Sequence, residues 1–290
     1  MMVTAFCPGH ITGFFQICEH KDPMRSGSRG GGLCVSLGAT SSVRMEEGNG
    51  EVIVTIDGKE QKAPVTVDAV SRIILDRKMD VYVDTKLDLP IGQGFGTSAA
   101  GALSAAHAAA ELLELPFRVA LRAAHEAELA NRTGLGDVAA LSRGGLTFRR
   151  KEGLPPFGLI DRINAEPEVV LCVIGSPLST HDILADQGRR KLVNEVGKDC
   201  VKRMSLSPTL ATLMRLSREF MIRTGLATGD VEEAVRAAED YGPASMAMLG
   251  NSVFAVGHVR DQDRVLSEMG TSFRCKVDWR GPRLLEAQSE

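Results

Sequence analysis

Short stretches of alternating apolar and polar residues, together with a few continuous apolar runs, predict β-strands along the chain. These strands are expected at 2–7, 33–44, 51–56, 81–87, 144–150, 169–174, 252–256 and 273–277. Pro8-Gly9-His10 predicts a turn that ends the first strand, and Asp57-Gly58 predicts a hairpin turn after the third. Residues 22–32 are rich in glycine, serine and arginine, so they are expected to form a mobile loop with few buried side chains.

Between the strands, apolar residues recur at helical spacing. Helices are expected at 67–77, 99–113, 116–131 and 261–269, with several more between 183 and 241. The run 99–113 favours a helix most strongly because it is dominated by alanine, which has the highest helix propensity. Interleaved strands and helices indicate an α+β fold. Gly153-Leu154-Pro155-Pro156 is the candidate linker, and it predicts two domains, at 1–160 and 161–290.

Composition narrows the classes of function. With 290 residues, 43% of them hydrophobic, the chain can bury one large core or two modest ones. The 34 lysines and arginines nearly balance the 37 aspartates and glutamates, and the resulting net charge of -3 argues against a nucleic-acid-binding protein. A small molecule bound at a local site is therefore the expected partner.

The spacing of the cysteines and the N-terminal residues indicate where in the cell the protein is located. The six cysteines form no C-x-x-C pair, which argues against a zinc site and indicates a reduced, intracellular protein. Residues 1–7 do not have the basic segment and apolar run of a signal peptide, and no apolar run approaches the ~20 residues of a membrane helix. A cytoplasmic location without membrane attachment is expected.

A glycine-rich loop, Gly92-x-Gly94-x-Gly96-Thr97-Ser98, lies between a predicted strand and the alanine-rich helix. Glycines let the backbone approach a large anion, and the start of the following helix directs free N–H groups at it. The loop therefore favours a triphosphate site, with the Ser98 hydroxyl available to Mg²⁺. The alternative is an ordinary strand–turn–helix connection in which Ser98 caps the helix. The spacing fits neither a Walker A loop nor a Rossmann loop.

Two carboxylates follow this loop. Glu128 lies on a predicted helix, and Asp137 follows a glycine in the loop after it. Phosphoryl transfer needs a metal ion on the phosphates and a group that orients or deprotonates the acceptor hydroxyl, and these two carboxylates could meet both needs. The alternatives are a solvated helix face for Glu128 and a helix cap for Asp137. Glu126 is the other candidate for the metal, and it points in a different direction on the same helix.

These motifs resemble those of the GHMP kinases. Residues 90–100, PIGQGFGTSAA, resemble the second motif of that superfamily, P-x-G-x-G-L-G-S-S-A-A, and residues 7–11 resemble the first, A-P-G-K-I, with His10 in place of the common lysine. Gly136-Asp137 matches the position of the catalytic aspartate. The third motif is usually glycine-rich, whereas the candidate at 244–255 is glycine-poor.

Within the superfamily, four stretches resemble the pantoate kinases. They are 8–15, 27–30, 133–137 and 245–250. The resemblance implies a two-domain GHMP kinase fold, with an N-terminal domain like ribosomal protein S5 domain 2 and a ferredoxin-like C-terminal domain, and with ATP in the groove between them. It also implies transfer of the ATP γ-phosphoryl group to the 4-hydroxyl of (R)-pantoate in coenzyme A synthesis.

The resemblance further assigns roles to individual residues. It implies that Asp137, Ser98 and Glu128 are catalytic, with Ser98 and Glu128 holding Mg²⁺. The nucleotide would contact Pro90, Gly92, Gly94, Phe95, Gly96, Thr97, Ser98 and Ala99. The pantoate carboxylate would be bound by Ser28, His125 and Arg149.

Two other functions stay open at this point. One is a GHMP kinase for another alcohol, such as shikimate, homoserine or mevalonate. The other is a non-catalytic protein of the same fold that senses a metabolite, although the presence of Ser98, Glu128 and Asp137 argues against lost catalysis. A homodimer is among the open oligomeric states, and the nucleotide preference is also open.

Overall fold

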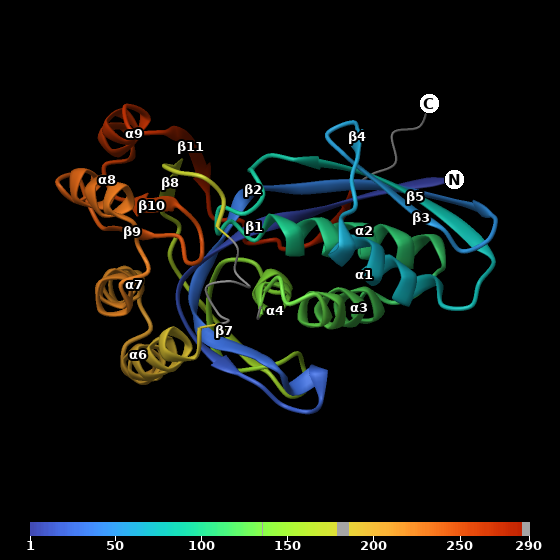
Figure 1. Cartoon of the computed structure of the whole chain (residues 1–290), viewed down its shortest axis with the longest axis horizontal. Coiled ribbons are helices and arrows are strands. Elements are labelled where there is room, and N and C mark those ends of the chain that lie inside the picture. Colours follow the sequence, from blue (N-terminus) through green and yellow to red (C-terminus); the bar gives the residue numbers. More distant parts are fainter. Residues whose placement is uncertain (135, 179–185, 286–290) are drawn as a thin grey trace.

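The computed structural model describes residues 1–134, 136–178 and 186–285, and in this part of the chain two β-sheets are covered by helices (Figure 1). The larger sheet has the strand order β12-β1-β2-β5-β3-β4, and β6 pairs with β2 and β7. Its strands are β1 Met2–Cys18, β2 Gly27–Glu47, β3 Val52–Ile56, β4 Lys59–Glu60, β5 Met79–Leu87, β6 Leu146–Lys151, β7 Leu159–Ile163 and β12 Arg283–Leu285. The helices of this half are η1 Pro23–Arg25, α1 Pro64–Ile74, α2 Thr97–Leu112, α3 Phe117–Ala130 and α4 Asp137–Leu141.

The second half contains a smaller sheet in the order β11-β8-β10-β9. Its strands are β8 Glu168–Val173, β9 Ala244–Met246, β10 Ser252–Val256 and β11 Thr271–Lys276. The helices are α6 Gln187–Leu206, α7 Leu210–Thr224, α8 Gly229–Glu239 and α9 Val259–Ser267. Figure 1 shows α1, α2 and α3 together beside the larger sheet and α6 to α9 at the other end of the molecule. None of the helices in the described ranges is long and apolar enough to span a bilayer.

The first strand does not end where its sequence predicts. Instead of turning at Pro8-Gly9-His10, β1 continues to Cys18, and its pairing with β2 shifts register between Pro8 and Gly9. A proline cannot donate to a strand ladder, and such an irregularity accommodates it. The His10 N–H donates to the Phe95 carbonyl (2.9 Å), and this bond ties β1 to the glycine loop. The predicted turn is therefore a bend within a long strand.

The prediction of a loop at 22–32 is also wrong over most of its length. After the short η1 turn, β2 begins at Gly27, and its first residues lie between β1 and β6, with Gly30 paired to Phe15 on one side and to Arg149 on the other. Backbone pairing needs no side chain, and here there is no room for one. A Cβ on Gly30 would lie 2.1 Å from the Phe14 carbonyl oxygen. The glycines thus permit close packing of strands.

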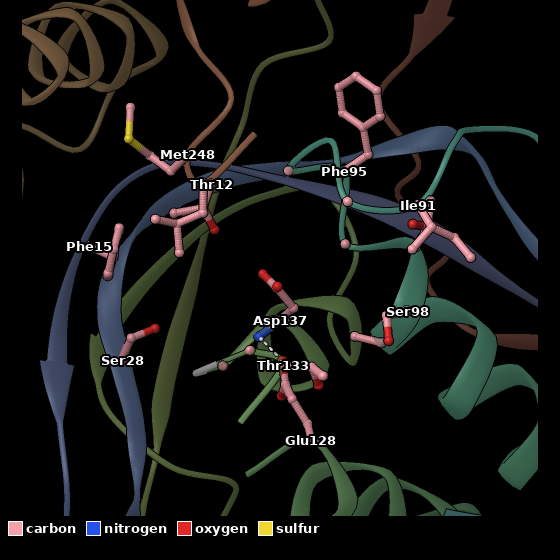
Figure 2. Close-up of a pocket in the computed structure, with 18 of the residues that line it drawn as sticks. Thr12, Phe15, Ser28, Ile91, Phe95, Ser98, Glu128, Thr133, Asp137 and Met248 are labelled. Atoms are coloured by element: carbon pink, nitrogen blue, oxygen red, sulfur yellow. Dashed lines mark hydrogen bonds between the residues drawn. The ribbon is translucent and has the colours of Figure 1, made fainter. Parts of the chain in front are cut away.

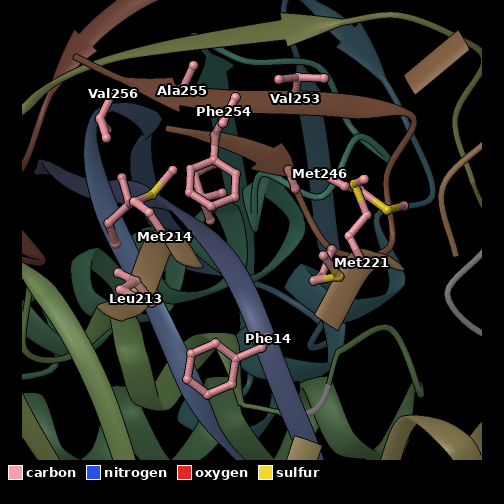
Figure 3. Packing of buried hydrophobic residues seen from close by; sticks show 14 of the residues in the cluster. Phe14, Leu213, Met214, Met221, Met246, Val253, Phe254, Ala255 and Val256 are labelled. Carbon is pink, nitrogen blue, oxygen red and sulfur yellow. The ribbon is translucent and has the colours of Figure 1, made fainter. Parts of the chain in front are cut away.

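A single hydrophobic cluster joins the two halves. Phe14 of β1 packs in the same buried group as Leu213 and Met214 of α7 and Phe254 of β10 (Figure 3). β1 is therefore paired in the larger sheet along its whole length, and near its end it also contributes to the core of the second half. Close packing of this kind resists deformation, so the shared cluster holds the two halves against each other.

The other predicted strands and helices lie within a few residues of their predicted positions, whereas the short strands β4, β7, β9 and β12 were not predicted. The division predicted at residue 160 falls inside β7, which pairs with β6 in the larger sheet, and the chain passes to the smaller sheet between β7 and β8. The two-domain boundary stays a prediction. Residue 183, where the helical region of the second half is expected to begin, and Leu135 of the 133–137 motif lie outside the described residues.

The close packing around β2 predicts a cost for any side chain at Gly30. Gly30→Ala would need the left-handed backbone (φ 150°) and would press a methyl group onto the neighbouring strand. We expect the free energy of unfolding to fall by about 1–3 kcal/mol, measured by urea denaturation. The matched control is Gly229→Ala at the start of α8, where nothing lies within 4 Å of the added carbon. Equal stability of the two variants would show that β2 tolerates a side chain there.

Candidate active site

A cavity of about 380 Å³ lies between the glycine loop, the end of α3, the start of α4 and the paired strands β1, β2 and β6 (Figure 2). Side chains and backbone from both halves of the chain surround it. The described lining residues are Thr12, Phe15, Ser28, Ile91, Gly92, Gly94, Phe95, Gly96, Thr97, Ser98, Ala99, Glu128, Asn131, Arg132, Thr133, Gly134, Gly136, Asp137, Arg149, Leu178, Met248 and Leu249.

The glycine loop has the backbone that its sequence predicts. Gly92, Gly94 and Gly96 all have left-handed φ values, at 76°, 72° and 64°. The second half of the chain holds the loop in place, because the Ser252 hydroxyl donates to the Gln93 carbonyl and the Gln93 amide donates to the Gly175 carbonyl (2.9 Å). These bonds attach the loop to the second half of the chain, and its backbone borders the cavity.

The nucleotide residues expected from the resemblance mostly line the cavity. Ser98 follows the first residue of α2, and Figure 2 places it across the cavity from Asp137. Pro90 is not among the lining residues, and its carbonyl instead accepts a bond from the Thr97 hydroxyl (3.4 Å). Phe95 borders the cavity but is almost fully buried in the core. The loop therefore offers mainly backbone and small polar groups to a phosphate chain.

Asp137 is the first residue of α4, and its side chain is 29% exposed to the cavity. One carboxylate oxygen, Oδ1, lies 2.9 Å from Nδ1 of His10. Burial acts to raise the pKa of Asp137, but hydrogen bonds from His10 and Thr12 and the charge of Arg149 together lower it below its ordinary value. Asp137 is therefore an ionised carboxylate at neutral pH.

His10 is buried on the far side of Asp137. Its Nε2 lies 3.4 Å from the Thr147 hydroxyl and 3.4 Å from NH1 of Arg149. Burial lowers the pKa of His10, against the opposing hydrogen bond and charge of Asp137. The imidazole is therefore neutral at neutral pH, which distinguishes it from the lysine common at this motif position.

Glu128 projects from α3 and is fully buried, next to Gly134. Its Oε1 accepts the Asp137 N–H (3.2 Å), and its Oε2 accepts the Val138 N–H (3.4 Å), so it caps the short helix α4 from another element. Burial, followed by the charge of Asp137, raises its pKa to about 8. Glu126, the alternative metal ligand, instead pairs with Arg72 (2.9 Å) and Arg122 (2.7 Å) and does not line the cavity.

Arg149 and Ser28 lie on adjacent strands at one wall of the cavity. The Arg149 side chain is only 2% exposed, and among the described residues its buried Nε has no hydrogen-bond acceptor. Gly136 leaves this corner open, since a Cβ there would lie 2.8 Å from the Ser28 hydroxyl and 3.8 Å from Arg149 Nε. A buried cation with an unused donor is suited to an anionic group of a ligand.

His125 does not join this group. It is buried on α3, its Nε2 lies 3.1 Å from the Pro23 carbonyl, and it is not among the residues that line the cavity. Several lining residues were not anticipated from the sequence. Thr12 and Met248 lie within the stretches that resemble pantoate kinases, so that resemblance is the signal that could have indicated them, whereas Arg132 is marked by no motif.

The donor set suits Mg²⁺. The described residues contain no group of three or more histidine, cysteine, aspartate or glutamate side chains that could hold a metal ion by themselves. Magnesium is commonly held by one or two protein oxygens, with phosphates and water completing its shell. The Ser98 hydroxyl and the Glu128 carboxylate line the same cavity, and a cation would stabilise the ionised form of that buried carboxylate.

Comparisons with known proteins agree with this geometry. The family model described as "GHMP kinases N terminal domain" matches residues 65–145. A pantoate kinase of Thermococcus kodakarensis is 34% identical over an alignment of 286 residues. The alignment covers 94% of each chain. A pantoate kinase of Methanospirillum hungatei is 32% identical over 290 residues, which cover 98% of this chain and 96% of the relative.

Solved structures extend the match to the fold. A structure described as "Phosphotransferase related to CoA biosynthesis pathway" has a TM-score of 0.91 and 30% identity, with 100% of both chains covered. A homoserine kinase from Cytophaga hutchinsonii has a TM-score of 0.72 at 16% identity, covers 98% of this chain and 97% of its own, and shows the fold alone. The expected two-domain α+β fold of the GHMP kinases is thereby confirmed. Given relatives above 30% identity along nearly the whole of both chains, this chain belongs to the pantoate kinase family of the GHMP kinases.

Proposed function

We infer that this chain transfers the γ-phosphoryl group of ATP to the 4-hydroxyl of (R)-pantoate. Its relatives are named for the phosphorylation of pantoate. The observation that carries the substrate assignment is the buried guanidinium of Arg149. Its Nε has no acceptor among the residues that the structure describes, and it lies near the Ser28 hydroxyl and Asp137 in a cavity bordered by the glycine loop. An acceptor with both a carboxylate and a hydroxyl matches that arrangement.

The carboxylate of pantoate would be bound by Arg149 and Ser28. Most of the affinity of a small, polar acid comes from charge-assisted hydrogen bonds, and a guanidinium can supply two parallel ones. Burial strengthens these bonds because little water competes for them. With its carboxylate at this wall, the substrate would have its hydroxyl near Asp137, since Gly136 and Asp137 are consecutive residues.

Asp137 would orient the hydroxyl and accept its proton. In a loose phosphoryl-transfer transition state the nucleophile needs alignment more than a strong base. A carboxylate whose pKa is held low serves alignment well, because it stays ionised and takes the proton only as the new bond forms.

The glycine loop and the start of α2 would bind the ATP phosphates through backbone N–H groups and the helix dipole. Ser98 and Glu128 would hold Mg²⁺, which supplies charge neutralisation on the β- and γ-phosphate oxygens. Glu128 would also keep the loop that carries Asp137 in position, because its two oxygens accept the first N–H groups of α4.

The direct test of the function is an ADP-release assay with Mg-ATP across a panel of hydroxy acids. (R)-Pantoate should support turnover far above mevalonate, homoserine or shikimate. A preference for one of the other three would overturn the substrate assignment and leave the GHMP kinase family unchanged. ATP binding without turnover on any acceptor would support a sensor.

Asp137→Asn keeps the shape of the side chain but removes its charge. We expect kcat to fall by about 10²–10⁴, the usual size of a base or positioning effect, because the hydroxyl loses its acceptor. Calorimetric titration should give a nearly unchanged Kd for ATP, since the phosphates are bound elsewhere. A near-normal kcat would leave Asp137 as a helix cap only.

Arg149→Lys keeps the charge but loses the forked donor. A charged hydrogen bond contributes roughly 1.5–3 kcal/mol, so the KM for pantoate should rise about tenfold to a hundredfold while the KM for ATP changes little. The control is Arg150→Lys, because Arg150 points the other way, is exposed and pairs with Asp161. An equal rise in both KM values would contradict a carboxylate site at Arg149.

Glu128→Gln tests the metal assignment through its pH dependence. A metal ligand must be deprotonated, and the pKa of Glu128 is raised to about 8, so protons should compete with Mg²⁺ below that pH. The Mg²⁺ concentration for half-maximal activity should therefore fall roughly 25-fold from about pH 6.5 to about pH 8.5 in the unmodified protein. Glu128→Gln should need more Mg²⁺ and lose this pH dependence.

The matched control is Glu126→Gln, two residues away. Because Glu126 is paired with Arg72 and Arg122 outside the cavity, its removal should leave both the Mg²⁺ requirement and its pH dependence unchanged. If Glu126→Gln rather than Glu128→Gln changed the Mg²⁺ response, the two roles would be reversed.

A further inference from the structure

His10 contacts three parts of the active site at once. Its backbone N–H binds the Phe95 carbonyl of the glycine loop (2.9 Å), its Nδ1 binds Asp137 (2.9 Å), and its Nε2 faces Arg149 (3.4 Å). We propose that His10 is a positioning residue for phosphoryl transfer, a neutral imidazole that holds the Asp137 carboxylate in its reactive orientation. This proposal rests on the function inferred above.

The hydrogen-bond partners fix which ring nitrogen carries the proton. A guanidinium can only donate, so Nε2 of His10 must accept from Arg149, and the Thr147 hydroxyl at 3.4 Å can donate to the same atom. The single proton of the neutral ring therefore lies on Nδ1, where it points at Oδ1 of Asp137. Figure 2 shows the Asp137 side chain extending into the cavity from α4, so this bond sets the direction from which the carboxylate meets a substrate.

The surrounding backbone leaves space for this ring. A Cβ on Gly32 would lie 2.7 Å from Nε2 of His10, and a Cβ on Gly96 would lie 3.2 Å from the His10 Cβ. Gly32 thus leaves room for the imidazole ring, and Gly96 leaves room for the backbone and Cβ of His10. The other polar groups that face the ring are Thr12, whose hydroxyl lies 3.4 Å from Nδ1, and Thr147.

The contact with Arg149 explains why a neutral residue suits this motif position. Arg149 is already a buried cation, and a second buried cation in the place of His10 would repel it and could not accept its hydrogen bond. A neutral imidazole accepts from Arg149 on one side and donates to Asp137 on the other. The residue assigned to the substrate carboxylate and the residue assigned to the acceptor hydroxyl are therefore connected through one ring.

The kinetic test compares three variants of His10 that differ in size and in whether they can donate a hydrogen bond from the position of Nδ1. The amide nitrogen of His10→Asn can replace Nδ1–H, whereas His10→Gln and His10→Leu fill more of the space without a donor at that position. We expect His10→Leu and His10→Gln to lower kcat by roughly 10–100-fold with little change in the KM for ATP, and His10→Asn to retain most of kcat. A space-filling role predicts the reverse order, with Asn the most damaged, and that result would overturn the proposal.

A second measurement does not depend on turnover. The ¹⁵N chemical shifts of the imidazole, assigned by the signal that disappears in His10→Leu, should show a neutral ring protonated at Nδ1 near pH 7. A ring protonated at Nε2, or a charged ring, would also overturn the proposal. If the unmodified protein failed to phosphorylate pantoate, the inferred function would be wrong. The ring tautomer would still test whether His10 donates a hydrogen bond to Asp137.

Discussion

The hydrogen bond between His10 and Asp137 is the interaction on which the site depends. It joins the long first strand to the short helix α4, and the same residue is held by the glycine loop through its backbone. Around it lie two more buried ionisable groups, Arg149 and Glu128, and both interact with Asp137. In a dry interior each such bond is strong when made and costly when absent. The site is consequently a single electrostatic unit and not a set of independent side chains.

The fold supplies the rigidity that this unit needs. β1 carries His10 in the larger sheet and, a few residues later, carries Phe14 into the core of the second half. The glycine loop is likewise bonded from the second half, through Ser252 and Gly175. Both walls of the cleft are therefore attached to the same strand and the same core, so the two inferred substrates would be brought together by a framework that is already packed.

Much of this site could be predicted from sequence where the signal is local. Gly92, Gly94 and Gly96 act through their own backbone angles, and Ser98 lies two residues after Gly96. The spacing of these residues in the sequence is therefore enough to predict the loop. Long-range pairing could not be predicted in this way. The strand that begins at Gly27 resembles a loop until β1 and β6 flank it, the resemblance that assigned His125 to pantoate could not show its bond to Pro23, and the contact of His10 with Asp137 joins residues 127 positions apart.

The glycines of β2 show that a position can be essential because it carries no side chain. Gly32 contributes no functional group, yet the imidazole of His10 occupies the space where its methyl group would lie. The shape of the active site therefore depends partly on positions without a side chain, and these lie on the same strand that brings Ser28 to the cavity. A side chain introduced at such a position would displace the imidazole that contacts Asp137, and a comparison of relatives that scored only polar or charged positions would overlook these glycines.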